Sequence, residues 1–393
     1  MQTWRFLHKI LTTSASLLHS ARFNALATCV EALLSGQRLS LTAIGRQLPR
    51  QAQPKHAIKC VDRLLGNPHL QRERLWLYAD VARQLVGAQR HPVVLVDWSP
   101  IDDRGRHFLL RAAIPFGKRS FPIYERVHHK DACPRCQNEL LANLAWMLPP
   151  QATPILVTDA GFKTPWLRAV EAYGWYYIGR VRGATQLRHD GESDWRRLES
   201  LFPLATREPA SRGPVTLAKT RSLATRLYLY RAPYRGRKDR NKNGSASRAR
   251  RSRKVAKGHR EPWVLVSNLT PRHHIADKVV QLYTLRMEIE EGFRDIKSER
   301  FGFAFNLHGT RHARRIEILL LIAMLASFRL LASGLFLDKA GKTPAYQSNT
   351  RRSRRGVSLW RLGCEGVLAR YPAGRMDGLL QLMRQEAARG VIV

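Results

Sequence analysis

Acidic residues are scarce in this sequence. Its 393 residues include 30 Asp and Glu against 67 Lys and Arg, which leaves a net charge of +37 at neutral pH. Such a charge describes the partners of a protein rather than its fold, and the polyanions of a cell are nucleic acids and anionic membranes. The hydrophobic content of 44% is sufficient for a folded core, and the length is typical of about two or three domains. A disordered, histone-like tail is therefore excluded.

Long apolar runs are also missing. The most apolar segment, residues 316–337, contains Glu317 and Arg329 and lacks the clean run of about 20 apolar residues that a transmembrane helix needs. We expect a buried helix there. Residues 1–23 have no compact apolar block followed by a small-residue cleavage site, as a secretory signal would have. We therefore expect a cytoplasmic protein with no membrane partner, which leaves nucleic acid as the polyanion.

The sequence also contains few cysteines. The five cysteines are odd in number and widely spaced, which is typical of a reducing compartment rather than of a disulfide framework. Cys133 and Cys136 enclose Pro-Arg and follow His128 and His129, so this motif contains residues of the types that bind zinc. The second pair of ligands that makes such spacing specific is missing. We expect a surface loop here rather than a metal site.

The first 88 residues are expected to be helical, because apolar residues recur there at spacings of three and four. Residues 40–48 resemble the first helix and turn of a helix-turn-helix unit. A second helix would begin near Lys55 and place Lys55, Lys59 and Arg63 at i, i+4 and i+8, which makes one basic ridge suited to a DNA groove or phosphate backbone. A solvated helix face explains the same spacing equally well.

An α/β region follows. Residues 91–97 form a β-branched apolar run that ends in Asp97, and residues 154–159 form a second such run that ends in Asp159. Strand ends are where open α/β sheets build their sites. Buried carboxylates need a cation or a metal ion, although simple capping by aspartate is the alternative. Further strands are expected at 107–115, 121–127 and 175–181, and helices at 137–148 and from Thr164.

Residues 183–262 lose the helical pattern and predict a β-rich insertion. Within it, residues 234–260 are poor in apolar side chains and rich in Lys and Arg. They cannot form a packed core and are expected to be an arm. We favour phosphate contacts over a solubilising role for this arm and for the arginines at its centre, Arg248, Arg250, Arg251 and Arg253. A last strand is expected at 261–269.

A long helix is predicted at 276–298, and another at 315–337. At about 100° per residue, Tyr283, Arg286, Glu290 and Lys297 share an arc of about 60° on the first of these helices. A stripe of one acid, two bases and a phenol is not a packing stripe. An exposed helix with salt bridges is the alternative reading.

These residues resemble the DDE transposases of the bacterial insertion-sequence-four family. The hallmark of that family is the pattern Tyr-x2-Arg-x3-Glu-x6-Lys, in which x is any residue. Residues 283–297 match this pattern without adjustment. The resemblance covers nearly the full length. It includes Val-Leu-Val-Asp97-Trp-Ser, Asp159-Ala-Gly-Phe-Lys, Arg63-Leu-Leu-Gly-Asn67 and Glu261-Pro-Trp263.

The resemblance implies an RNase H-like catalytic core interrupted by a β-rich insertion. Asp97, Asp159 and Glu290 would be the catalytic triad, holding two Mg²⁺ ions for which Mn²⁺ would substitute. Tyr283, Arg286 and Lys297 would hold DNA phosphates. Trp263 would stack on a base that leaves the helix during hairpin formation, unless it is an ordinary core tryptophan.

The implied function is cut-and-paste transposition in the bacterial cytoplasm, associated with the nucleoid. The partners would be double-stranded DNA at the transposon ends and at the target, and further copies of the chain in a synaptic complex. The alternatives are a catalytically inactive DNA-binding relative that represses transposition, and a nuclease that does not join strands. We expect residues 1–88 to form a helical DNA-end-binding region. The core would consist of residues 89–182 and of residues 263–337, which contain the catalytic helix, with the insertion at 183–262 between them. Residues 338–393 would form a helical C-terminal region.

Overall fold

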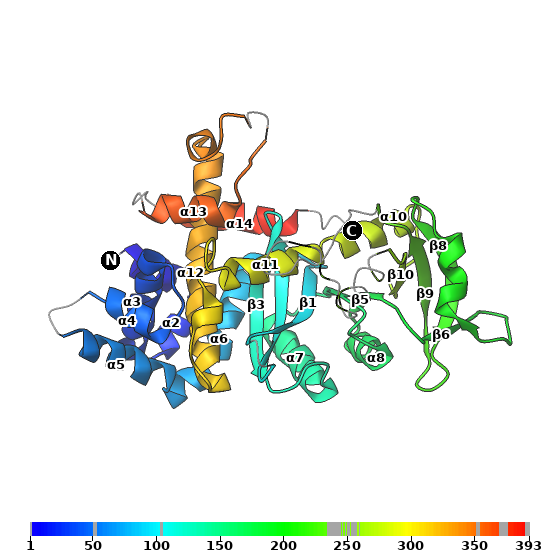
Figure 1. Cartoon of the computed structure of the whole chain (residues 1–393), viewed down its shortest axis with the longest axis horizontal. Coiled ribbons are helices and arrows are strands. Elements are labelled where there is room, and N and C mark those ends of the chain that lie inside the picture. The colour runs from blue at the N-terminus through cyan, green and yellow to red at the C-terminus, as the bar shows by residue number, and fades with distance from the viewer. Residues whose placement is uncertain are drawn as a thin grey trace. The chain divides into compact units, whose positions relative to one another are not determined.

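The computed structural model is a mixed α/β protein (Figure 1). It describes residues 2–49, 53–102, 105–233, 260–350, 354–368 and 376–389, together with Ser245, Ser247, Ala249, Ser252 and Gly258. The chain divides into two compact units. The first unit combines residues 1–154 with 285–393, and the second comprises residues 155–284.

The first unit begins with helices, as the spacing of apolar residues predicts. They are α1 (Gln2–Ile10), α2 (Ser14–Leu17), α3 (Ser20–Gly36), α4 (Leu41–Gln47), α5 (Pro54–Leu65) and α6 (Pro68–Val86). Ser40 caps α4 by accepting a hydrogen bond from the Ala43 backbone N–H at 3.2 Å. A Cβ on Gly45 would lie 2.6 Å from the Cα of Ile58. Glycine at this position therefore lets α4 cross α5 closely, as in the expected pair of helices.

Three antiparallel strands follow in the order β3-β2-β1. They are β1 (Val93–Pro100), β2 (Phe108–Phe116) and β3 (Arg119–His128), and α7 (Pro134–Met147) comes after them. The strands at 107–115 and 121–127 and the helix at 137–148 are thus confirmed to within a few residues. The motif expected as a surface loop is instead the start of α7, because Cys133 is the N-cap of that helix.

The C-terminal part of the first unit is helical. It contains α11 (Met287–Lys297), η2 (Phe305–Leu307), α12 (Ala313–Lys339), η3 (Thr343–Tyr346), α13 (Leu359–Leu368) and α14 (Met376–Ala388). By length and hydropathy α12 would be able to cross a membrane, but its most apolar stretch is wholly buried. It packs against α3, α6, β3 and α13. The prediction of a buried helix at this position is confirmed.

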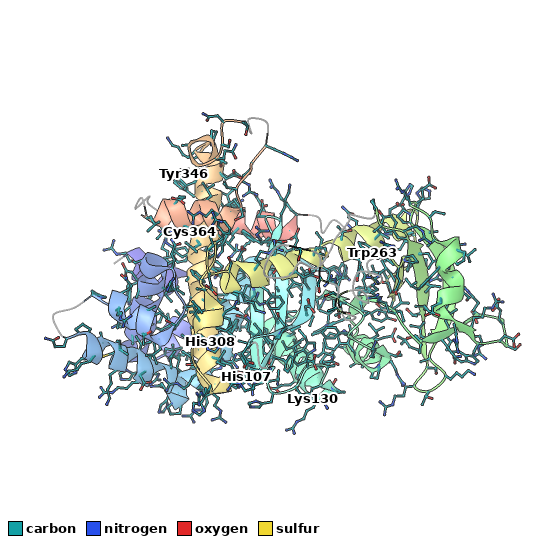
Figure 2. All side chains as sticks on the ribbon, in the orientation of Figure 1. His107, Lys130, Trp263, His308, Tyr346 and Cys364 are labelled. Atoms are coloured by element: carbon teal, nitrogen blue, oxygen red, sulfur yellow. The ribbon has the colours of Figure 1, made fainter. Side chains whose placement is uncertain are left out.

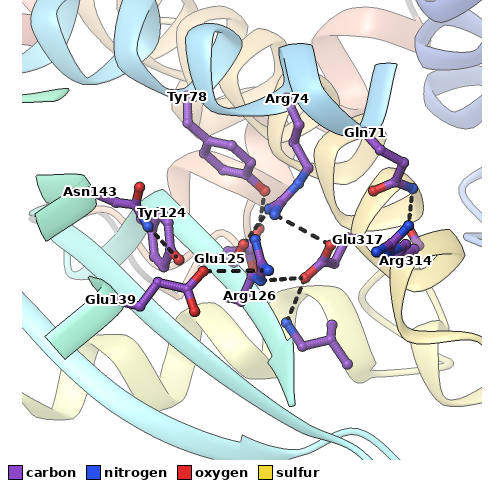
Figure 3. Close-up of polar contacts among 11 residues, drawn as sticks. Gln71, Arg74, Tyr78, Tyr124, Glu125, Arg126, Glu139, Asn143, Arg314 and Glu317 are labelled. Atoms are coloured by element: carbon purple, nitrogen blue, oxygen red, sulfur yellow. Dashed lines mark hydrogen bonds and ion pairs between the residues drawn. The ribbon is translucent and has the colours of Figure 1, made fainter. Parts of the chain in front are cut away.

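A buried network of charged side chains fixes α12 against β3 and α6 (Figure 3). Glu317 on α12 lies 3.3 Å from Arg74 of α6 and 3.4 Å from Arg126 of β3. Beside them, Glu125 accepts hydrogen bonds from Arg111 at 2.6 Å and from the Tyr78 hydroxyl at 2.9 Å. Unpaired charges are costly in a protein interior, so these partners specify one packing arrangement of the two helices on the strands.

The described residues of the second unit contain seven strands in the order β4-β5-β10-β9-β8-β6-β7. They are β4 (Ile155–Thr158), β5 (Tyr176–Arg180), β6 (Gln186–His189), β7 (Arg196–Arg197), β8 (Ala210–Leu217), β9 (Leu223–Tyr230) and β10 (Trp263–Ser267). Its helices are α8 (Thr164–Ala172), η1 (Leu198–Leu204) and α10 (Ile275–Thr284). β4 and β5 are parallel and joined by α8, whereas the other paired strands are antiparallel.

Two further predicted elements differ from the structure. The single helix expected at 276–298 is two helices, α10 and α11, with a break at Leu285 and Arg286. The strand expected to end at Asp97 continues to Pro100, so Asp97 lies inside β1 opposite Arg111 of β2. Asp159, by contrast, follows β4 directly, as expected.

Candidate active site

The carboxylate of Asp97 is held on β1 in a largely covered position. Its side chain is 15% exposed, and Oδ1 accepts a hydrogen bond of 2.8 Å from the Trp98 backbone N–H. Oδ2 lies 3.7 Å from Nη1 of Arg286. The local fold therefore orients one carboxylate oxygen by a backbone donor and directs the other toward a cation.

Arg286 and Glu290 lie at the start of α11. Arg286 is the N-cap residue, and its side chain is 14% exposed, whereas that of Glu290 is 43% exposed. Nη2 of Arg286 donates a hydrogen bond of 2.7 Å to Oε1 of Glu290. Acidic side chains also suit the first turn of a helix because of its dipole. One guanidinium thus faces two carboxylates, Asp97 and Glu290, from elements far apart in the sequence.

Lys297 ends the same helix and connects it to β1. Its Nζ donates hydrogen bonds of 2.6 Å to the Ser99 hydroxyl and of 2.6 Å to the Pro100 carbonyl oxygen. Burial, and secondarily the neighbouring Arg111, lowers the pKa of Lys297 to about 8, while Asp97 acts in the opposite direction. At neutral pH the side chain is still mostly a cation, placed on the strand that contains Asp97.

Phe293 contacts two cations near the site, Arg111 and Lys297. Its ring lies 4.3 Å from the guanidinium carbon of Arg111 and 5.4 Å from Nζ of Lys297, measured to the ring centroid. Such contacts are attractive because the face of an aromatic ring is electronegative. Phe293 therefore offers one ring to two cations that lie near Asp97.

The opposite side of α11 is anchored to β3. Arg119 lies 2.9 Å from Glu291 and 3.2 Å from Asp295. A Cβ on Gly292 would lie 2.5 Å from the Ser120 hydroxyl oxygen, so the absence of a side chain allows α11 to approach β3. The salt bridges expected for an exposed helix thus exist, but they fix one face of α11 while Glu290 and Lys297 remain on another.

An open groove of about 540 Å³ runs along the outer face of α11. Its lining includes Glu290, Phe293 and Lys297, and the basic side chains of Arg294 and Arg300. A shallow, polar groove with cations on both sides of a carboxylate suits an extended polyanion better than a small apolar ligand.

The second unit contains the other candidate carboxylate. Asp159 is partly exposed in the loop between β4 and α8, and its Oδ1 accepts a hydrogen bond of 2.8 Å from the Gly161 N–H. Lys163 closes the same loop by donating to the Ala160 carbonyl oxygen at 2.8 Å. Asp159 therefore lies at the carboxyl end of a parallel strand, the position at which α/β sheets present functional groups.

Trp263 and Tyr283 meet in the second unit. Their ring centroids are 4.9 Å apart in an edge-on arrangement, and Tyr230 also packs edge-on against Trp263, at 5.4 Å. Tyr283 is 3% exposed, whereas Trp263, labelled in Figure 2, is only half-buried. The prediction that Tyr283 shares one face of a single helix with Glu290 and Lys297 is wrong, because the helix breaks between them.

The predicted DNA contacts outside the site are of two kinds. Lys55, Lys59 and Arg63 are exposed on α5, which is the geometry expected of a ridge. Arg248, Arg250, Arg251 and Arg253 lie outside the described residues.

Three neighbours of the site were not predicted from the sequence: Ser99, Phe293 and Arg111. The position of Ser99 was predictable, because residues two apart in a strand share a face and Ser99 is two residues after Asp97. The positions of Phe293 and Arg111 were not predictable from a local pattern, since these residues are brought together only by packing of α11 against β2.

The donor set fits divalent metal ions. Within the described ranges, no group of three or more His, Cys, Asp or Glu side chains is arranged so that it could hold a metal ion. Asp97 and Glu290 nevertheless direct carboxylate oxygens, the ligands that Mg²⁺ prefers, at one shared cation, the Arg286 guanidinium. A site that gathers positive charge between two carboxylates is chemically suited to a metal ion.

A mixed α/β protein with paired carboxylates, flanking cations and an open groove has the features of an enzyme that acts on a polyanion. A family model described as the transposase DDE domain matches residues 89–327, which is more than half of the chain. The chain belongs to this family. It is therefore a transposase, a class of nucleic-acid enzyme that generally uses divalent metal ions and acts on DNA. In a search of curated proteins, nothing matches the sequence.

Proposed function

We propose that this protein is a cut-and-paste DNA transposase of the insertion-sequence-four type, closest to the transposase of the tetracycline-resistance transposon. The observation that supports this most directly is the pair of carboxylates, Asp97 and Glu290, that face one guanidinium in a chain of the DDE family. In this proposal Asp159 of the second unit is the third carboxylate. Three oxygen-donor side chains suffice to hold two hard divalent ions.

The proposed architecture is an RNase H-like core, residues 89–182 and 263–337, interrupted by a β-rich insertion at 183–262. Residues 1–88 would bind transposon ends, and residues 338–393 would form a helical C-terminal region. The protein would act in the bacterial cytoplasm, close to the nucleoid, and would associate with itself in a synaptic complex on DNA.

The three carboxylates, Lys297 and Arg286 have different roles in this proposal. Asp97, Asp159 and Glu290 would hold two Mg²⁺ ions, or Mn²⁺ in their place, and these ions supply charge stabilisation at the attacking and leaving oxygens of phosphoryl transfer. Lys297 is fixed by Ser99 and Pro100, so its ammonium offers a preorganised cation for a phosphate beside the scissile bond. Arg286 offers a planar fork of donors suited to a phosphate or a carboxylate.

The reaction would proceed in four steps at one site. Water nicks the first strand, the freed 3′-hydroxyl forms a hairpin on the opposite strand, the hairpin is reopened, and the 3′ end then attacks target DNA. Trp263 is half-buried and edge-on to two tyrosines, so it is suited to stack on the base that leaves the helix. Stacking of a base on an aromatic side chain is worth about 1–3 kcal/mol. Tyr283 is 3% exposed and lies beside this ring, so in this proposal it supports Trp263 instead of holding a phosphate as the resemblance implies.

The test uses DNA that carries the inverted repeats flanking the gene. Asp97→Asn, Asp159→Asn and Glu290→Gln should each abolish Mg²⁺-dependent nicking and leave binding to the ends intact, because each removes a charged ligand and little volume. Glu299→Gln is the matched control, since Glu299 is an exposed carboxylate lining the same groove as Glu290. Wild-type rates of nicking in any of the three variants would refute the triad.

Two further outcomes separate the alternatives. A wild-type protein that binds the ends but does not nick them at any Mg²⁺ or Mn²⁺ concentration would be a repressor. A protein that nicks but does not join pre-cleaved 3′ ends to target DNA would be a nuclease.

A further inference from the structure

Two thiols face each other at the start of α7. Cys133 is the N-cap residue, and the backbone N–H of Cys136 donates a hydrogen bond of 3.4 Å to its sulfur. The N-cap side chain and the third helical residue face one another at the beginning of a helix. In ideal helix geometry their Cα atoms are about 5 Å apart, a separation that a disulfide bond spans without movement of the backbone.

The two thiols differ in acidity. Hydrogen bonds from the Cys136 side chain and backbone, with a smaller effect of the Lys130 ammonium, lower the pKa of Cys133; Lys130 is labelled in Figure 2. Burial, and then the hydrogen bond to Cys133, raises the pKa of Cys136 to about 12, and Glu139 acts in the same direction. Cys133 is therefore the more acidic thiol of the pair, and it is the one expected to attack first as the thiolate.

The other three cysteines lack this arrangement. Cys29 and Cys364 are buried, and burial raises the pKa of each to about 12. Cys60 is exposed on α5. Cys29, the thiol that interacts with Cys60, is buried, whereas Cys133 and Cys136 are both partly exposed and linked by a hydrogen bond, which is the environment of reactive cysteines.

A zinc site is disfavoured by the surroundings of the pair. His128 packs edge-on against Trp98 with ring centroids 5.5 Å apart, and Nδ1 of His129 lies 3.3 Å from the Arg106 carbonyl oxygen. In the part of the chain that the structure describes, no third ligand joins the two sulfurs.

We propose that Cys133 and Cys136 form a redox-active dithiol that small-molecule disulfides oxidise to an intramolecular disulfide. The Cys133 thiolate attacks one sulfur of the small disulfide, forms a mixed disulfide and expels one thiolate. The Cys136 thiol then loses its proton to water and attacks the Cys133 sulfur, which releases the second thiolate. The protein dithiol loses two electrons, and the small disulfide gains them as two thiols.

The helix that holds the pair is fixed independently of the sulfurs. Glu139 of α7 lies 3.4 Å from Arg126 of β3, and the Asn143 amide donates to the Tyr124 hydroxyl at 3.1 Å (Figure 3). Oxidation therefore closes a bond within one helical turn and leaves the attachment of α7 to β3 in place. The reaction can be followed on the whole folded protein.

The experiment exposes the full-length protein to oxidised glutathione at graded ratios to reduced glutathione, with thiol counting and peptide mapping. The wild-type protein should lose two thiols as a Cys133–Cys136 disulfide. Cys136→Ser should accumulate a glutathione adduct on Cys133, because the attacking thiolate remains and the resolving thiol is gone. Cys133→Ser should react several-fold more slowly at Cys136. Cys60 is the internal control, since it is exposed and the thiol that interacts with it electrostatically, Cys29, is buried, so a mixed disulfide is the expected product there.

Three results would overturn the proposal. One is glutathione addition at Cys60 under conditions where no Cys133–Cys136 disulfide forms. Another is equal adduct formation at Cys133 and Cys136 in the two single variants. The third is a purified protein that retains one equivalent of zinc with both thiols protected. None of these results bears on the transposase proposal.

Discussion

The guanidinium of Arg286 donates a hydrogen bond of 2.7 Å to the carboxylate of Glu290. The same guanidinium reaches within 3.7 Å of Asp97. Two carboxylates that would otherwise repel each other are thus held together by one cation. A divalent ion at these oxygens would have to share them with Arg286 or displace it.

Replacement of Arg286 by glutamine should therefore tighten metal binding in the absence of DNA. The change removes the cation that lies between Asp97 and Glu290, so we expect the affinity for Mn²⁺ to rise several-fold in a titration monitored by electron paramagnetic resonance. Arg294→Gln is the control, because Arg294 is on the same helix but pairs with Glu291 at 2.7 Å. Unchanged or weaker Mn²⁺ binding in the Arg286 variant would show that this side chain does not compete for the carboxylate oxygens.

The sequence predicted part of this site because Arg286, Glu290 and Lys297 all lie on or next to one helix, where spacing translates into position. Tyr283 does not follow the same rule. The helix breaks after Thr284, whose hydroxyl donates to the Val280 carbonyl oxygen at 2.9 Å, and resumes when the Glu288 N–H donates to the Leu285 carbonyl oxygen at 2.8 Å. No proline or glycine marks this break, so the periodicity of the side chains continues through it.

The strand that contains Asp97 shows a second limit. The β-branched pattern stops at Asp97, yet Trp98, Ser99 and Pro100 continue the strand by pairing with β2. Lys297 reaches Ser99 and Pro100 from a position about 200 residues later in the chain. Long-range contacts of this kind leave no local pattern, which is why Phe293 and Arg111 were also not predicted.

Gly292 is predicted to be essential for the position of α11. A methyl group at this residue would lie 2.5 Å from the Ser120 hydroxyl oxygen and 3.1 Å from its carbonyl oxygen. Gly292→Ala should therefore lower the free energy of unfolding by about 1–3 kcal/mol, as overpacking typically does, and should slow DNA cleavage by moving Glu290.

Urea denaturation checks this prediction with two comparisons. Gly378→Ala, in an exposed part of α14 with no neighbour within 4 Å, should instead stabilise the protein by about 0.5–1 kcal/mol, because alanine favours helix. Ser120→Ala should partly rescue Gly292→Ala by removing the nearer oxygen. A Gly292→Ala protein as stable as wild type would show that α11 and β3 have room to separate.

Glu288 is predicted to make stability depend on pH. Burial raises the pKa of this carboxyl from 4.5 to about 7, although the Phe116 backbone and the Arg119 guanidinium act against the shift. The folded protein therefore holds the proton more tightly than the unfolded chain, and the resulting stabilisation is fully present below about pH 4.5 and is lost as the pH rises through about 7.

Glu288→Gln removes this loss. Relative to wild type, its free energy of unfolding should rise by about 1–3 kcal/mol between about pH 4.5 and about pH 8, measured by urea denaturation at both pH values. Glu299→Gln, at an exposed position of the same unit, controls for the general effect of removing an acid from a basic protein. A difference between Glu288→Gln and wild type that stays constant with pH would contradict a buried, protonated carboxyl.

The basic ridge on α5 is predicted to contact phosphates of transposon-end DNA. Lys55, Lys59 and Arg63 are all exposed, and each phosphate contact contributes about 0.9 to the slope of log affinity against log salt concentration. The triple change of these residues to glutamine should therefore reduce that slope by about 2–3 in a binding titration over a range of salt concentrations. The same number of charges is removed in a control triple at Lys9, Lys219 and Lys339, which are exposed on other elements. Because net charge falls equally in both variants, a smaller slope in the ridge variant alone assigns the contacts to α5, whereas equal slopes in the two variants would make the ridge an ordinary solvated helix face.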